Sequence, residues 1–284
     1  VARAVDTDLA NLAALLKRAA LHRGTAFVEV LQNCNMFADG TYAALTDKAN
    51  ERLSMERRLR RAIERDEFLL HYQPQVDLKS GEIGGFEALV RWRHPERGLV
   101  PPGDFISLSE EVGLIDRLGA FVLHTACRDA ISWPGSVKVA VNLSAIQFRS
   151  GRLVELVEEA LRQSGLEAHR LELEITEGVM LMDTSGVLNQ LRQLKRMGVH
   201  ISLDDFGTGY SSLSYIRNFP FDKIKIDQSF VRELGSSADS LAIIRAVAGM
   251  CGSLGIATTA EGVENDAQLE ILSKEKCDSV QGWL

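Results

Sequence analysis

The feature that most constrains this chain is an alternation, from Leu69 onward, of short apolar or β-branched runs with stretches of helical periodicity. The strand-like runs lie at residues 69–78, 84–92, 137–145, 170–176, 200–206, 223–228, 256–263 and 279–284, and the helical stretches at 104–132, 151–164, 184–197, 211–218, 236–254 and 265–274. This alternation is typical of α/β folds. Eight strands with interleaved helices over about 215 residues favour a closed, TIM-like (β/α)8 barrel over an open sheet.

One connection departs from the ordinary barrel pattern. Residues 79–83 join the first two strand-like runs, and this is the length of a hairpin turn. Parallel neighbours need a crossover of about a dozen residues or more. We therefore expect one strand of the barrel to run antiparallel to its neighbour.

The residues before the first run have a different pattern. Met55, Leu59 and Ile63 form one apolar stripe between charged residues, which predicts a lead-in helix packed on the barrel. Further upstream, an Ala/Leu-rich helical stretch at 9–21 and one strand-like run at 25–32 offer too little apolar surface to bury a core alone. The sequence thus predicts an N-terminal segment that is not a domain, a lead-in helix and a barrel domain, at residues 1–48, 49–67 and 68–284.

Charge and composition exclude several classes of partner. Lys and Arg number 32 against 39 Asp and Glu, so the net charge of −7 gives no general attraction to duplex nucleic acid. Any phosphate ligand must be held by a local site. No apolar stretch reaches the length of a membrane span, and the cysteines are too far apart for a zinc site, which predicts a soluble, cytoplasmic chain with reduced thiols.

Polar side chains that are costly to bury lie at the carboxyl ends of most predicted strands, where barrel enzymes build their sites. They are Glu87, Asn142, Glu174, Asp204, Asp205, Lys225, Glu261 and Gln281. Taken alone, each acid is more often a solvated helix cap. In a closed barrel, however, five carboxylates and an amide would meet beside one lysine, and divalent cations would neutralise this excess of negative charge.

The type of ligand atom indicates which cation. Oxygen donors favour Mg²⁺ or Mn²⁺ over zinc. The adjacent Asp204 and Asp205 suit two ions about 3.5 to 4 Å apart, an arrangement that hydrolyses phosphodiesters. Arg91, four residues beyond Glu87, either meets a phosphate oxygen or forms a surface ion pair.

Other enzyme classes find less support. The glycine-rich segment 205–212 precedes a helical stretch but lacks the lysine of a P-loop. The histidines form no His-Glu-x-x-His pattern, and no Gly-x-Ser-x-Gly motif indicates a serine hydrolase.

These residues resemble the EAL-domain family of bacterial cyclic di-GMP phosphodiesterases over residues 50–284. The name of the family is spelled by Glu87, Ala88 and Leu89. Further motifs occur in the order typical of the family: YQPQVDL, VNLSAIQF, LELEITE, DDFGTGYSS, KIKIDQSFV, AEGVE and VQGWL.

The resemblance implies a role for each matching position. A first metal is held by Glu87, Asn142, Glu174 and Asp204, and a second by Asp204, Asp205 and Glu261. Lys225 orients the attacking water alongside Asp205, so that the catalytic residues are Lys225, Asp205, Glu261 and Glu87. The substrate contacts are Gln73, Leu89, Arg91 and Gln281. Glu177 fixes the Asp-Phe-Gly-Thr-Gly loop.

The family hydrolyses one phosphodiester bond of cyclic di-GMP to give linear pGpG, with Mg²⁺ or Mn²⁺ as cofactor. The resemblance therefore implies a signalling phosphodiesterase, and a homodimer through the loop and helix at 205–218. A catalytically silent receptor that binds cyclic di-GMP is the alternative.

Two parts of the chain depart from the family pattern. The chain stops at Leu284, soon after the last strand-like run, whereas relatives continue through a final helix, so we expect a C-terminally truncated barrel. Residues 1–48 resemble a late segment of the β subunit of 2-oxoacid:ferredoxin oxidoreductases without its thiamine-diphosphate motif. This predicts a non-catalytic fusion, or else a divergent natural linker.

Overall fold

The computed structural model describes residues 2–5, 28–31, 43–180, 182, 184–207, 218–235 and 237–282. The chain divides into two compact units, Val1–Arg61 and Ala62–Leu284. In the first unit, strands β1 (Ala2–Val5) and β2 (Val28–Leu31) pair in parallel. Strand β2 lies within the predicted run 25–32, while β1 was not predicted and the predicted helix 9–21 lies outside the described residues.

Helix α2 (Ala43–Glu64) overlaps the predicted lead-in helix at 49–67, but it begins earlier and ends sooner. Its packing on the barrel and the division of the chain at residues 48 and 67 stay predictions.

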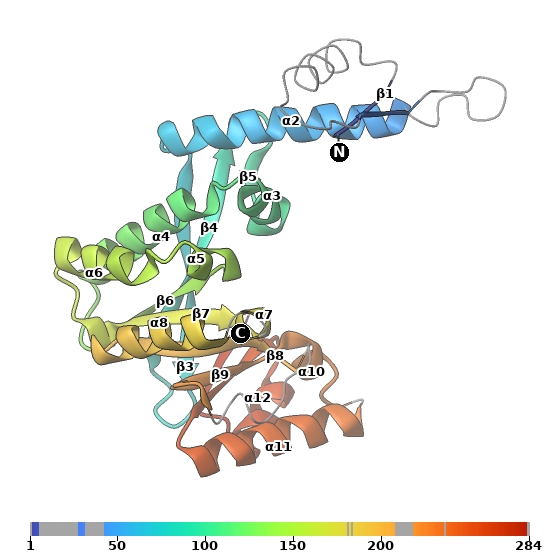
Figure 1. Ribbon diagram of the computed structural model, residues 1–284. Coiled ribbons are helices and arrows are strands. Elements are labelled where there is room, and N and C mark those ends of the chain that lie inside the picture. Colours follow the sequence, from blue (N-terminus) through green and yellow to red (C-terminus); the bar gives the residue numbers. More distant parts are fainter. Residues whose placement is uncertain are drawn as a thin grey trace. The chain divides into compact units, whose positions relative to one another are not determined.

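The second unit is the predicted closed barrel of eight strands (Figure 1). Its strands are β3 (Phe68–Asp77), β4 (Ile83–His94), β6 (Lys138–Leu143), β7 (Leu171–Thr176), β8 (His200–Phe206), β9 (Lys223–Ile226), β10 (Ala257–Val263) and β11 (Ser279–Gly282). Each strand lies within or close to one of the eight predicted runs. The ring closes because β3 pairs with both β4 and β11, which confirms the predicted fold class.

The antiparallel strand is β3, which runs against both of its neighbours. A tight turn imposes this direction: Asp77 accepts hydrogen bonds from the backbone N–H groups of Lys79 and Ser80, and Gly81 has a φ of 71°. A short additional strand, β5 (Gly98–Val100), pairs antiparallel with the end of β4. The prediction of one antiparallel barrel strand is confirmed.

The helices of the second unit lie outside its ring of strands in Figure 1. The longer helices match the predicted stretches: α3 (Ile106–Glu111), α4 (Ile115–Ala130), α6 (Leu153–Ser164), α8 (Thr184–Arg196), α11 (Ala238–Leu254) and α12 (Asp266–Lys274). The short helices α5 (Ala145–Arg149), α7 (Glu177–Met180) and α10 (Gln228–Arg232) were not predicted, because one turn shows no periodicity. Most of the predicted helix 211–218 lies outside the described residues.

The two faces of each strand differ in polarity. In β7, Leu171, Leu173 and Ile175 are fully buried on one face, as are Glu172 and Glu174 on the other. The apolar side chains pack under the helices, whereas the two glutamates point into the barrel with the other polar residues of its interior. The outer layer therefore supplies the core of the fold, and the interior is available for chemistry.

None of the helices in the described part of the chain is both long enough and apolar enough to span a membrane. Cys127, Cys251 and Cys277 are buried free thiols, as the sequence predicts for these three positions.

Candidate active site

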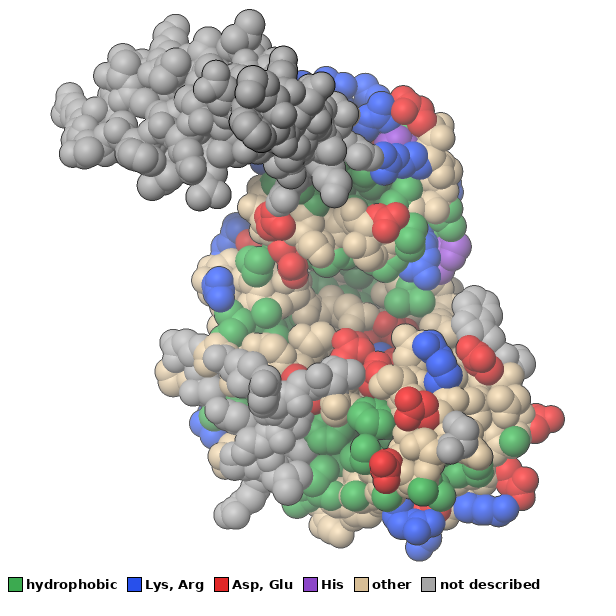
Figure 2. Space-filling view, turned by 90° about the vertical axis from the view of Figure 1, so that its right-hand side faces the viewer, with side chains coloured by type: hydrophobic (Ala, Val, Ile, Leu, Met, Phe, Trp, Pro, Cys, Tyr) green, Lys and Arg blue, Asp and Glu red, His purple; other side chains and the backbone are tan. Residues whose placement is uncertain are grey.

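Strand pairing brings the predicted site residues to one end of the barrel. All of its strands other than β3 run in the same direction, so their carboxyl ends meet. The register places Asn142 beside Glu174 and Glu261 beside Gln281 on neighbouring strands. Figure 2 shows acidic side chains gathered in a hollow in the middle of one face.

Lys225 on β9 lies at the centre of this cluster and is 1% exposed. Its ammonium Nζ contacts four carboxylates from four other strands: Glu261 at 2.7 Å, Glu174 at 2.9 Å, Asp204 at 3.0 Å and Glu87 at 3.3 Å. The residues that the sequence analysis assigned to a common site are therefore within reach of one another.

The carboxylates keep Lys225 charged. Burial by itself would lower the pKa of this amine, but Glu174, followed by the other three acids, raises it well above its ordinary value. Complete burial raises the pKa of Glu174 well above its ordinary value, although Lys225 opposes the shift.

The pKa of Glu87, by contrast, is lowered. Burial by itself would raise it, but Lys225 and two amide donors outweigh the effect of burial. These donors are the Nε2 of Gln281 at 2.6 Å and the Nδ2 of Asn142 at 2.6 Å. Glu87 is thus held as a carboxylate in a fixed orientation.

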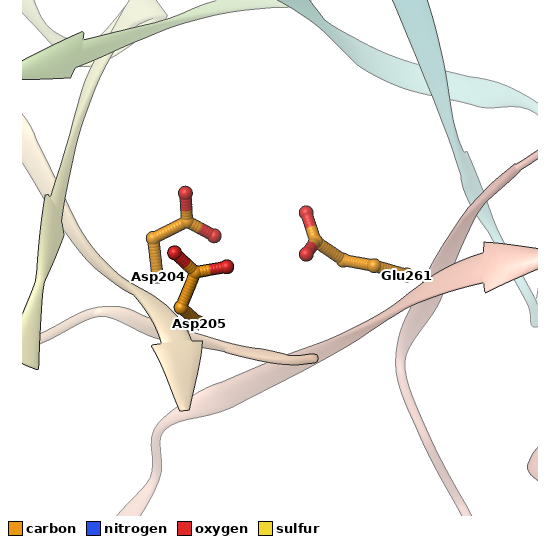
Figure 3. Close-up of side chains that lie close together, drawn as sticks. All are labelled: Asp204, Asp205 and Glu261. Atoms are coloured by element: carbon orange, nitrogen blue, oxygen red, sulfur yellow. The ribbon is translucent and has the colours of Figure 1, made fainter. Parts of the chain in front are cut away.

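A second group of acids comprises Asp204, Asp205 and Glu261, which each offer an oxygen within 4.8 Å of the others. Their carboxylates point toward one another inside the ring of strands (Figure 3). In a regular strand, two consecutive aspartates would point to opposite faces. Here the pairing of β8 with β9 is irregular between Leu203 and Phe206, and Asp205 has a φ of 55°. The irregularity turns both aspartates toward the site.

Strand β10 has a similar irregularity beside Glu261. Its register with β11 shifts between Glu261 and Val263, and Gly262 has a φ of 70°. A Cβ atom at Gly262 would lie 2.6 Å from the Cβ of Gln228, so a larger residue does not fit without movement. Two local departures from ideal strands therefore shape the acidic group.

The close approach of like charges helps to raise the pKa values of Asp205 and Glu261. Burial and the neighbouring Asp204 raise the pKa of Asp205. Burial also raises the pKa of Glu261 to about 7, with Lys225 opposing the shift and Asp204 adding to it. A cation placed among these oxygens would relieve the repulsion.

The donor set fits hard divalent cations. Four carboxylates, those of Glu87, Glu174, Asp204 and Glu261, contact one ammonium, and Asp205 adds a fifth carboxylate beside Asp204 and Glu261. The buried Oδ1 of Asp204 lies 3.0 Å from Lys225 Nζ but makes no hydrogen bond of acceptable geometry. Oxygen ligands and surplus negative charge suit Mg²⁺ or Mn²⁺.

Glu177, at the start of α7, contacts the loop after β8. Its Oε1 accepts a hydrogen bond from the backbone N–H of Gly207 at 2.8 Å. Gly207 has a φ of 100°, and a Cβ there would lie 2.6 Å from the Phe230 ring. The contact agrees with the loop-fixing role expected for Glu177, although residues 208–217 of the loop lie outside the described residues.

The predicted substrate contacts lie on strands β3, β4 and β11. Gln73 lies opposite Glu87 in the β3–β4 pairing, and its Oε1 accepts from Gln281 Nε2 at 3.0 Å. Leu89 lines a largely apolar pocket of about 340 Å³ that also reaches Asn142. Arg91 lies further along β4, where its Nη1 donates to the carbonyl of Val90 at 2.9 Å.

The site predicted from the sequence left out three further polar residues of the interior, Gln75, Glu172 and Lys223. Gln75 on β3 is 4% exposed, and the ion pair of Lys223 with Glu172 is buried below the site, at 2.8 Å. The alternating Gln73 and Gln75 of YQPQVDL were the available signal. Asp227 shares a face with Lys225 in the sequence, but its carboxylate instead caps helix α10 by accepting from Ser229 N at 3.0 Å.

Comparisons with known proteins agree with this architecture. The bifunctional diguanylate cyclase/cyclic di-GMP phosphodiesterase MucR of Pseudomonas aeruginosa is 44% identical over 246 residues, which cover 85% of this chain and 36% of MucR. Cyclic di-GMP phosphodiesterase NbdA of the same organism is 43% identical over 241 residues, 84% of this chain and 31% of NbdA. The chain thus spans about a third of the length of these curated relatives.

A solved structure extends the comparison. The PaMucR phosphodiesterase in complex with c-di-GMP superposes with a TM-score of 0.76 at 45% identity, covering 79% of this chain and 92% of that chain. The EAL domain model matches residues 56–284. Residues 1–48 lie outside that match, so the resemblance to an oxidoreductase subunit gains no support from it. Because the match spans more than half of the sequence, the chain belongs to the EAL domain family.

Proposed function

We propose that this chain is a cyclic di-GMP phosphodiesterase that uses two Mg²⁺ or Mn²⁺ ions and releases linear pGpG. The observation that carries the proposal is the cluster of four carboxylates at Lys225, with Asp205 beside two of them, in a chain similar to named cyclic di-GMP phosphodiesterases. The ions would be held by Glu87, Asn142, Glu174 and Asp204 on one side, and by Asp204, Asp205 and Glu261 on the other.

When bound, such ions supply an activated water and neutralise charge on the phosphoryl group. The residues of the chain position the reactants. Lys225 donates a hydrogen bond to the attacking water, and Asp205 accepts one from it. The water would give a proton to Asp205 as its oxygen bonds to phosphorus. The bond from phosphorus to the 3′ oxygen would break, and the 3′ oxygen would take up a proton from solvent, which gives a linear dinucleotide with a 5′ phosphate.

Binding of the substrate would use the residues around the acids. The apolar pocket beside Leu89 has the size and lining for a purine base, with Glu110 as a polar group at its wall. Arg91 would contact a phosphate oxygen, and the amides of Gln73 and Gln281 would contact the rest of the dinucleotide.

The test is incubation of the purified chain with cyclic di-GMP, with product identification by mass spectrometry. We expect pGpG in the presence of Mn²⁺ or Mg²⁺ and none after chelation. Glu87→Ala should abolish turnover, because it removes a metal ligand and the acceptor for two amides, whereas Glu270→Ala, at an exposed pair with Lys274, should leave it unchanged. Saturable binding without product would instead support the receptor alternative.

We also propose an oligomeric state, a cellular location and a role for the N-terminal segment. We infer a homodimer through residues 205–218 from the family resemblance, and sedimentation of the purified chain would test it. We propose a cytoplasmic location, because the proposed substrate is a messenger in the cytoplasm. Residues 1–48 are proposed to be non-catalytic, so their deletion should leave the turnover per barrel unchanged.

A further inference from the structure

A series of hydrogen bonds runs through the barrel interior from Lys223 to Glu87. The Nζ of Lys223 donates to Gln75 Oε1 at 3.1 Å, and Gln75 Nε2 donates to Gln281 Oε1 at 3.1 Å. The Nε2 of Gln281 then donates to Glu87 Oε2 at 2.6 Å and to Gln73 Oε1 at 3.0 Å. Strand pairing sets up the series, because Gln75 lies directly opposite Gln281 between β3 and β11.

The series has one possible direction. Lys223 is a donor without acceptor atoms, whereas the Glu87 carboxylate is an acceptor without hydrogens. The amide of Gln75 must therefore turn its oxygen toward Lys223, which leaves its NH₂ group to face Gln281. Gln281 must in turn present its NH₂ group to Glu87. Glu172, at 2.8 Å from Lys223 Nζ, holds the donor end in place.

Burial makes the opposite direction of the hydrogen-bond series costly. Gln75 and Gln281 are 4% and 5% exposed, and the side chain of Lys223 is 14% exposed. A reversed amide would place two oxygens or two NH₂ groups face to face away from water, which is costly. The Nε2 of Gln75 also lies 3.5 Å from Oε1 of Glu174, one of the acids that contact Lys225.

We propose that Gln75 is a positioning residue for the phosphodiesterase reaction: it fixes the amide orientation of Gln281 and thereby the orientation of the Glu87 carboxylate. The inference rests on the proposed function, in which Glu87 holds a metal ion. Partners that orient metal ligands typically contribute about 10- to 100-fold in metal affinity or activity.

Two substitutions at Gln75 separate orientation from packing. Gln75→Glu keeps the size but replaces the donor by an acceptor, so Gln281 must turn its NH₂ group away from Glu87 and point its oxygen there. Gln75→Met removes the polar link while filling a similar volume. We expect each variant to raise the Mn²⁺ dissociation constant and lower kcat by about tenfold, with KM at saturating Mn²⁺ changed by less than about threefold.

The matched control is Gln190→Met on α8, which removes an amide that donates to the Phe148 carbonyl at 3.0 Å, remote from the acids. It should leave kcat and the Mn²⁺ dissociation constant unchanged. If the Gln75 variants lowered only the thermal unfolding midpoint, with kcat and Mn²⁺ binding as in the wild type, Gln75 would be structural and the inference would be wrong.

A second measurement is independent of turnover. Side-chain amide resonances of ¹⁵N-labelled glutamine report the hydrogen bonds of Gln75 and Gln281 in the full chain. We expect Lys223→Met and Gln75→Glu to shift both side-chain signals of Gln281, and an unchanged Gln281 signal in either variant would overturn the inference. A wild-type chain without turnover would refute the proposed function, while the amide signals would still decide the role of Gln75.

Discussion

At the residue scale, Lys225 has the most unusual environment in the described part of the chain. A buried amine normally loses its charge, but here carboxylates from four strands hold the proton. Their mutual repulsion is in turn reduced by the amine. Under the proposed function, catalysis and stability therefore depend on the same contacts.

We predict that Lys225→Met lowers kcat by about 100-fold or more, because it removes a charged donor aimed at the reacting atoms. Without metal it should also destabilise the fold, since the remaining acids repel one another, and Mn²⁺ should restore part of the lost stability. Steady-state kinetics and thermal unfolding with and without Mn²⁺ measure both effects. Lys274→Met is the control, because that lysine forms an exposed pair with Glu270. Equal losses in the two variants would contradict the prediction.

His200 begins β8, below the acidic cluster. Burial, followed by the nearby Lys138, lowers its pKa below the ordinary 6.5, although Asp222 opposes the shift. As the pH falls, His200 therefore takes up a proton in the unfolded chain before it does so in the folded chain. The neutral imidazole thus contributes to the free energy of unfolding above about pH 6.5, and this contribution is lost as the pH falls through the lowered pKa of the folded chain.

We predict that His200→Gln reduces the loss of stability between pH 7 and pH 5. Urea unfolding of both proteins at several pH values in this window measures the difference in slope. A steeper dependence on pH in the variant would show that the sign of the shift is wrong.

At the scale of elements, the irregularities of β8 and β10 determine where the carboxylates of the site point. Each one turns a carboxylate toward the centre at the expense of regular pairing. Positive φ values at Asp205 and Gly262 accompany them. Local strain of this kind persists where the surrounding structure imposes it.

We predict that Gly262→Ala destabilises the fold by about 1 kcal/mol more than Gly165→Ala. Both glycines have a φ between 70° and 76°, but a Cβ at Gly165 has no neighbour within 4 Å, whereas one at Gly262 meets Gln228. Urea unfolding gives the two free energies. Gly262→Ala should also weaken Mn²⁺ binding, because it displaces Glu261, and equal effects of the two substitutions on stability and binding would count against this account.

At the scale of the whole molecule, the acidic cluster joins strands that are far apart in the sequence. Residues 87, 174, 204 and 261 each come from a different barrel strand. A cation bound among them stabilises the closed barrel because the unfolded chain offers no such arrangement.

Divalent metal should therefore raise the thermal unfolding midpoint. At a free Mn²⁺ concentration of about 100 times the dissociation constant, one site contributes about 2.7 kcal/mol. Asp204→Asn should remove most of this shift, since Asp204 belongs to both proposed ion sites, and calorimetric scans of the two proteins measure it. An unfolding midpoint of the wild type that does not respond to Mn²⁺ would argue against a metal site.

The sequence by itself determined the barrel, the positions of its eight strands and the presence of one antiparallel strand. Strand and helix periodicity and the length of one turn are local properties, so they can be recognised without the tertiary structure. It also determined which acids lie at strand ends. Only the tertiary structure decided that Asp204 and Asp205 face the same way, that Lys225 contacts four acids at once, and that Gln75 links Lys223 to Gln281. These features depend on bulges and on strand register around a closed ring, which arise from contacts between residues up to about two hundred positions apart.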